Sequence, residues 1–144
     1  MRALLDANVL IAFLDTEHNF HERAFDWFKA NEYLGWATCP ITENAVLRIL
    51  TNPSYSKLKH FRLLDLLPLL RNNMQTTDHE FWPDDISLLD ETIIAGENIL
   101  GPKQLTDVYL LAVAVKNQGR LVTFDARIAI NSVYGATKDS LYVL

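Results

Sequence analysis

The chain has 144 residues, and its hydrophobic content of 49% is enough for one buried core, which predicts a single domain over residues 1–144. Its formal net charge of −5 argues against a broad basic footprint for nucleic acid. The one cysteine, Cys39, excludes an internal disulfide. Since no run approaches the ~20 apolar residues of a membrane span and no signal peptide is recognisable, we expect a cytoplasmic protein without a membrane partner.

The charges are distributed unevenly along the chain. Residues 48–71 carry five basic side chains and one acidic side chain, whereas residues 78–97 carry seven acidic side chains and neither Lys nor Arg. If four of the 18 acidic residues held metal, the other 14 would nearly balance the 13 basic residues. The basic segment is therefore compatible with a bound phosphate chain, although such a segment is more often a solvated helix face.

The first element is a short apolar run over residues 2–5 that ends in Asp6, after which helical spacing begins at Val9. A strand covered on both faces of a parallel sheet needs no polar alternation, so we expect strand, acidic turn and helix. Asp6 would then lie at the carboxyl edge of the sheet. Taken alone, Asp6 is better explained as a helix N-cap. Asn8 could orient Asp6 or a metal-bound water, or cap the turn itself.

The next helix is predicted from Asn19 to Asn31. Glu22 follows Asn19 by three residues, which is the spacing of a capping box, and aromatic side chains then recur at helical spacing. A second strand is predicted over Tyr33–Cys39.

Pro40 is expected to open a helix whose first turn contains Thr42 and Glu43. Acidic side chains stabilise the positive end of the helix dipole, so Glu43 has an ordinary structural explanation. The same dipole keeps a carboxylate ionised and able to hold a cation.

The middle of the chain is harder to assign. We expect a pair of helices over Lys57–Arg71 interrupted near Pro68, a short strand over His79–Trp82 and a helix over Ser87–Ile94. A last strand is expected over Ser140–Leu144.

Two acidic side chains stand beside apolar elements between residues 105 and 127. Thr106 is expected to cap a helix that has Asp107 in its first turn and stops at Gly119. The strand 121–124 follows at once and is closed by Asp125.

The alternation of short apolar runs with amphipathic helices predicts a three-layer α/β/α sandwich around a mostly parallel sheet of four or five strands. In such a fold, strand ends and helix starts meet at one edge of the sheet, where ligands bind. This predicts convergence of Asp6, Glu43, Asp107 and Asp125. Carboxylate oxygens without Cys or suitably spaced His favour Mg²⁺ or Mn²⁺.

Four segments that contain these acids resemble the motifs of the PIN-domain nucleases: LLDANVLI, ITENAVLRIL, LTDVYLLAVAV and LVTFDARI. Their order and spacing, over residues 4–128, resemble the VapC-type toxins of prokaryotic toxin–antitoxin pairs. The resemblance implies that the four acids form the catalytic, metal-binding set. It also implies four polar neighbours of that set: Asn8, Thr42, Thr106 and Thr123.

What the resemblance implies functionally is a Mg²⁺- or Mn²⁺-dependent endoribonuclease that cleaves single-stranded or loop regions of a structured RNA. It also implies a homodimer and a small antitoxin that covers the crevice and inserts a basic side chain among the acids. The candidates for phosphate contact are the basic side chains Arg48, Lys57, Lys59, Arg62, Lys116 and Arg127.

Two other functions stay open at this point. A haloacid-dehalogenase-like phosphatase also begins with an apolar strand and two acids in a DxD pattern, but here Asn8 stands at the second acidic position and no downstream acidic pair with a matching Lys is evident. A non-catalytic PIN-like interaction module would keep the fold and only bind a partner.

Overall fold

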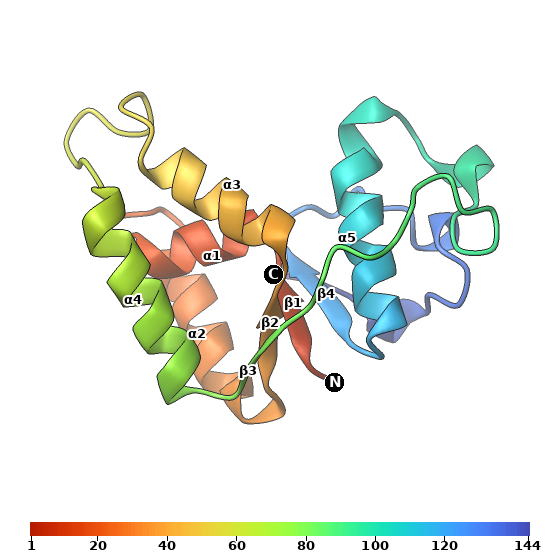
Figure 1. The fold of residues 1–144 in the computed structure, drawn as a ribbon, viewed down its shortest axis with the longest axis horizontal. Coiled ribbons are helices and arrows are strands. Elements are labelled where there is room, and N and C mark those ends of the chain that lie inside the picture. Colours follow the sequence, from red (N-terminus) through yellow and green to blue (C-terminus); the bar gives the residue numbers. More distant parts are fainter.

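The computed structural model describes residues 1–144 and contains one five-stranded sheet (Figure 1). Every neighbouring pair of strands is parallel. In spatial order the strands are β3 (His79–Phe81), β2 (Trp36–Thr38), β1 (Ala3–Leu5), β4 (Arg120–Thr123) and β5 (Leu141–Val143). The α-helices are α1 (Ala7–Leu14), α2 (His21–Asn31), α3 (Pro40–Leu50), α4 (Leu63–Thr76) and α5 (Leu105–Lys116).

The two faces of the sheet are covered by different helices, with α1 to α4 on one side and α5 on the other (Figure 1). Alternate strand residues enter the two cores. Leu5 and Val122 pack with side chains of α1 to α4, whereas Leu4 and Leu121 pack with α5. The predicted three-layer α/β/α sandwich with a parallel sheet is confirmed. The assignment of residues 1–144 to one domain stays a prediction.

Helix α5 is buried around most of its circumference, which explains why apolar residues occur on almost all of its sides. All seven residues from Val108 to Ala114 are buried. The helix packs on the sheet with one side, and Trp82, Ile94 and Val133 belong to the same core cluster. No helix of the structure is long and apolar enough to span a membrane.

The ends of α5 differ from the sequence prediction. The residue before the helix is Gln104, so Thr106 lies inside the first turn and is not the N-cap. At the other end, Gln118 takes the left-handed conformation, with φ 55°. The amide of Gly119 donates to the carbonyl of Ala114 (2.8 Å), which closes a Schellman turn in which Gly119 is the second residue beyond the cap.

The first capping prediction is also wrong. Helix α2 begins at His21 after Phe20, without a side-chain cap, because the amide of Phe20 donates to Nδ1 of His18 (3.0 Å) instead. The predicted second strand is shorter than expected. Residues 32–34 form a 3-10 turn, so β2 begins only at Trp36.

Helix α4 passes through Pro68 without interruption, and residues 57–62 are not helical, contrary to the predicted pair of helices. Proline removes one hydrogen bond to the carbonyl four residues before it. That residue, Leu64, is 72% exposed, so water can satisfy its carbonyl.

Residues 87–94 form turns, and the helix predicted there is absent. The hydroxyl of Ser87 accepts the amide of Leu89 (3.1 Å), and the carboxylate of Asp90 accepts the amide of Thr92 (2.9 Å). Such local side-chain bonds compete with the helical hydrogen-bond pattern. The apolar spacing of this segment therefore did not decide its conformation.

Gly119 has a packing role that gives the first prediction. A Cβ at this position would lie 2.5 Å from the Trp82 ring and 2.6 Å from the backbone carbonyl of Arg2. We expect Gly119→Ala to lower the free energy of unfolding by about 1–3 kcal/mol, as overpacking does. Urea unfolding measures this. Gly96→Ala is the matched control because a Cβ there meets nothing within 4 Å, and equal effects of the two variants would contradict the prediction.

Candidate active site

Asp6 follows β1 and has two hydrogen-bonding roles at once. Its Oδ1 accepts the amide of Ala7 (2.7 Å), which caps α1. Its Oδ2 accepts the hydroxyl of Thr123 (2.7 Å), because the parallel register of Leu5 with Val122 places the next residue of each strand side by side. Burial raises the pKa of Asp6, and the negative charge of Asp125 adds to the rise, while these two hydrogen bonds oppose it.

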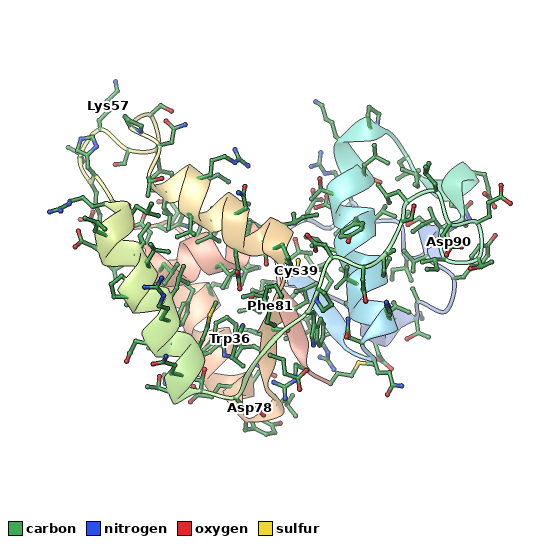
Figure 2. All side chains as sticks on the ribbon, in the orientation of Figure 1. Trp36, Cys39, Lys57, Asp78, Phe81 and Asp90 are labelled. Carbon is green, nitrogen blue, oxygen red and sulfur yellow. The ribbon has the colours of Figure 1, made fainter.

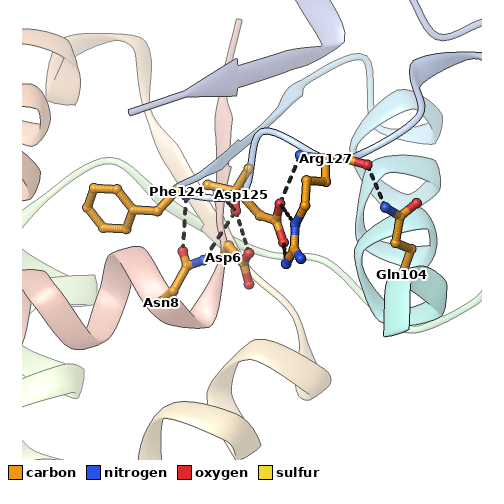
Figure 3. A network of polar contacts seen from close by, with 7 residues as sticks. Asp6, Asn8, Gln104, Phe124, Asp125 and Arg127 are labelled. Carbon is orange, nitrogen blue, oxygen red and sulfur yellow. Dashed lines mark hydrogen bonds and ion pairs between the residues drawn. The ribbon is translucent and has the colours of Figure 1, made fainter. Parts of the chain in front are cut away.

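The Thr123 hydroxyl joins three residues of the site (Figure 3). Besides donating to Asp6, it accepts the side-chain amide of Asn8 (3.3 Å) and the backbone amide of Asp125 (3.1 Å). The Oδ1 of Asn8 accepts the amide of Phe124 (3.4 Å), which ties the start of α1 to the end of β4. Of the expected neighbours, Thr123 thus contacts the acidic residues directly, whereas Asn8 is joined to them only through Thr123.

Asp125 is paired with an arginine of its own turn. Arg127 Nε donates to Asp125 Oδ1 (3.0 Å) and Nη2 donates to Oδ2 (2.8 Å). These hydrogen bonds hold the pKa of Asp125 below its usual value. Gln104 fixes the turn by donating to the backbone carbonyl of Arg127 (2.6 Å), while the Arg127 side chain remains 78% exposed (Figure 3).

Asp107 lies in the first turn of α5 and approaches Asp6 and Asp125 from the helix layer opposite α1 to α4. Burial, together with the charges of Asp6 and Asp125, raises its pKa to about 6, against a smaller lowering by Arg127. The three carboxylates influence one another because they converge from β1, α5 and the end of β4. We call Asp6, Asp107 and Asp125 the three-aspartate cluster.

Glu43 lies outside this cluster. Its Oε1 accepts the hydroxyl of Thr38 (2.6 Å), and Glu43 is not among the causes of any pKa shift in the three-aspartate cluster. Side chains along β2 point alternately to the two faces of the sheet, and this explains the position of Glu43. Thr38 points to the side of Trp36 and α1 to α4, whereas Asp107 comes from α5. No group of three or more His, Cys, Asp or Glu side chains lies close enough in this structure to hold a metal ion.

The side chains of the other two expected neighbours form no hydrogen bond with any of the four acids. Thr42 is fully buried, and its hydroxyl pairs with the backbone of Cys39 in the capping box of α3. Thr106 is exposed in the first turn of α5.

The expected phosphate-contacting cations fall into two groups. Four of the six form an ion pair with an acidic side chain: Lys59, Arg62, Lys116 and Arg127. Arg48 and Lys57 form none. Lys57 lies at the tip of the connection between α3 and α4, whereas Cys39 lies near the centre of the molecule (Figure 2).

Three contacting residues were not predicted from the sequence. Thr38 and His79 hold Glu43, and Gln104 holds the turn of Arg127. The strand predicted over His79–Trp82 placed His79 in a strand. Its hydrogen bond to Thr38, however, depends on β3 lying next to β2, and the spacing of apolar residues does not reveal that order.

The family model of the PIN domain matches residues 3–133. A crystal structure of VapBC2 from Rickettsia felis bound to a DNA fragment from their promoter has the same fold, with a TM-score of 0.62. The comparison covers 100% of this chain and 99% of that one, at 13% sequence identity, so it concerns the fold alone. Together with the site geometry, these matches define a PIN domain.

Three relatives from Mycobacterium tuberculosis (strain H37Rv) narrow the class. Ribonuclease VapC44 is 45% identical over 144 residues, with 100% of both chains covered. Ribonuclease VapC38 is 41% identical over 86% of this chain and 85% of its own length, and Ribonuclease VapC39 is 37% identical over 94% and 96%. The chain therefore belongs to the VapC ribonuclease family of PIN-domain proteins.

The raised pKa of Asp107 predicts how stability depends on pH. An unfolded aspartate has a pKa of about 3.9, whereas that of folded Asp107 is raised to about 6. The folded chain binds this proton more tightly, so the contribution of Asp107 to the free energy of unfolding falls as pH rises from about 4 to about 6. In metal-free buffer we expect Asp107→Asn to match the wild type near pH 4 and to be more stable at pH 7.

Urea unfolding at both pH values measures this difference. Asp90→Asn is the control of opposite sign, because hydrogen bonds from Thr92 lower the pKa of Asp90. That variant should gain no stability at pH 7. A gain for Asp107→Asn that is equal at both pH values would contradict the pKa shift.

Proposed function

We propose that this chain is the toxin ribonuclease of a toxin–antitoxin pair and hydrolyses RNA phosphodiester bonds with the help of Mg²⁺ or Mn²⁺. The observation that carries the proposal is the convergence of the three-aspartate cluster at the carboxyl edge of a PIN-domain sheet. The similarity to the VapC ribonucleases over the whole chain supports the same activity.

The donor set fits a hard divalent cation. The cluster offers carboxylate oxygens only. Burial raises the pKa of Asp107 to about 6 with the help of repulsion from Asp6 and Asp125, and a bound cation would relieve that repulsion. We propose Asp6, Asp107 and Asp125 as ligands, with Glu43 joining from the neighbouring strand. A divalent ion held by these residues would supply the positive charge that activates a water nucleophile and stabilises the leaving oxygen.

The side chains around the cluster have separate proposed roles. Thr123 fixes the oxygen of Asp6 that it contacts, and Asn8 fixes Thr123. Arg127 bonds to both oxygens of Asp125, so Asp125 is freest to act as a ligand when Arg127 turns away. The freed guanidinium is then beside the cluster, where it can contact a phosphate. Glu43 or Asp125 orients the attacking water.

The proposed substrate is a single-stranded or loop region of RNA. Base-specific recognition of RNA relies on unstacked bases in such regions. Among the six expected candidates, Arg48 and Lys57 are the cations best able to contact its phosphates, since they form no ion pair within the protein. Lys57 would act at some distance from the centre of the molecule, at the tip of its connection (Figure 2).

We also propose a protein partner. The structural neighbour from Rickettsia felis is described as a VapBC assembly, and the bidentate pair of Arg127 with Asp125 illustrates how readily this cluster accepts a guanidinium. A small antitoxin that covers the crevice would insert an arginine or lysine in the same way. A homodimer stays a prediction from the family resemblance.

Purification from the native cell tests the partner. We expect the chain to be recovered together with a small protein from its own operon, in a complex that blocks RNA cleavage. The measurement is native mass spectrometry of the purified complex. Recovery of free protein alone, at native expression levels, would contradict the proposal.

Asp107→Asn separates catalysis from stability. The substitution removes a charged ligand, so we expect RNA cleavage to be abolished while metal-free stability is unchanged or raised. A hundredfold excess of Mn²⁺ over its Kd should stabilise the wild type by about 2.7 kcal/mol through linkage and should affect the variant much less. Thermal melts with Mn²⁺ and with EDTA, beside an RNA cleavage assay, measure both effects.

The opposite result would identify Asp107 as a simple helix-end residue. Asn stabilises a helix start nearly as well, so cleavage would persist and metal would change neither melting curve. The same assay examines the two alternatives. A haloacid-dehalogenase-like phosphatase turns over small phosphate esters, and an interaction module turns over nothing.

A further inference from the structure

We propose that His79 is a positioning residue for Glu43 and acts through the hydroxyl of Thr38. This inference rests on the proposed function, in which Glu43 belongs to the active site. We call the two hydrogen bonds that join His79, Thr38 and Glu43 the Thr38 bridge.

The geometry of the Thr38 bridge determines which group donates in each of its two hydrogen bonds. Thr38 Oγ1 lies 2.6 Å from Glu43 Oε1 and 2.8 Å from His79 Nε2. A hydroxyl has one proton to donate, and a carboxylate can only accept. The Thr38 proton therefore goes to Glu43, and His79 donates Nε2–H to Thr38. This fixes the tautomer of the His79 ring.

Strand pairing brings the histidine to this place. Trp36 and His79 are direct partners in the β2–β3 register, and Thr38 is two residues beyond Trp36 on the same side of the sheet. The Trp36 ring packs on the imidazole with a centroid separation of 4.5 Å, and its Nε1 is fixed by a hydrogen bond to Thr77 (2.7 Å). The imidazole is thus held in place by a buried ring on β2.

The bridge is sheltered from solvent at its centre. Thr38 is fully buried, so water does not compete for its hydroxyl. Burial and the charge of Arg2 lower the pKa of His79, against a smaller rise from Glu80. A neutral imidazole therefore suffices as the donor, and the bridge adds no second charge beside Glu43.

The consequence concerns the freedom of the Glu43 side chain. A glutamate at a helix start has three rotatable torsions, and the short bond from Thr38 fixes one carboxylate oxygen while Oε2 accepts no hydrogen bond within the protein. Oε2 is then the oxygen available to a cation or a water. Hydrogen-bond partners one step behind a ligand typically change metal affinity or activity by about 10–100-fold when removed.

Matched pairs of variants test the bridge. Thr38→Val and His79→Phe remove a hydrogen bond, whereas Thr38→Ser and His79→Gln keep a hydroxyl or an N–H donor at nearly the same position. We expect the first pair to lower kcat about tenfold with little change in KM, and to weaken Mn²⁺ binding in calorimetry without RNA by a similar factor. The conservative pair should recover most of both losses.

Two further measurements distinguish positioning from a general structural effect. The double variant Thr38→Val/His79→Phe should be no less active than Thr38→Val alone, because both substitutions break the same bridge. The imidazole nitrogen resonances of wild-type His79 should report the Nε2–H tautomer. His60→Phe, at an exposed histidine, is the control and should leave kcat and Mn²⁺ binding unchanged.

The outcomes separate this inference from the proposed function. If wild-type protein does not cleave RNA, the proposed function is wrong. If wild type cleaves RNA and Glu43→Gln does not, but folded His79→Phe cleaves and binds Mn²⁺ like wild type, the Thr38 bridge is wrong and the proposed function stands. An Nδ1–H tautomer at His79 would also overturn the bridge.

Discussion

The hydroxyl of Thr123 is the contact on which the proposed site depends. It holds the Asp6 carboxylate by donation and the backbone of Asp125 by acceptance. Both acids stand at the ends of central strands whose faces are covered by helices, so little water reaches Asp6. A carboxylate withdrawn from water is costly unless other groups solvate it. For Asp6, the Thr123 hydroxyl and the amide at the start of α1 provide this solvation, whereas Arg127 pairs with the more exposed Asp125.

The sheet edge divides the site between two layers. Strand alternation directs Asp6 and Thr123 toward α5 and Asp107, and directs Thr38 toward the layer of α1 to α4, where it holds Glu43. The four acids therefore share an edge without sharing a face. In the proposed function, the carboxylates approach a common cation from both layers. The hydrogen-bond partners that orient each carboxylate therefore matter for metal binding as much as the acids themselves.

The sequence predicted the parts of this arrangement that depend on continuous apolar runs. β1 is buried throughout, β4 and α5 are buried over most of their residues, and their ends bring Asp6, Asp107 and Asp125 close enough for their charges to interact. It failed where short-range polar bonds decide the backbone, as at residues 87–94, and where strand order decides a contact. Nothing in the spacing of Thr38 and His79 reveals that β3 lies beside β2.

The protein carries a net negative charge, and so does the RNA that it is proposed to bind. Because its surface ion pairs are weak, this repulsion can be overcome locally at the site. Arg127 is mostly exposed, and exposed ion pairs contribute little to stability because water screens them. A divalent cation or a partner's arginine can therefore displace Arg127 from Asp125 at small cost, and the displaced guanidinium remains beside the cluster. The same exchange changes the local charge from negative toward positive where a phosphate would bind. An acidic protein thus needs no broad basic surface, because the positive charge is concentrated at the reacting group.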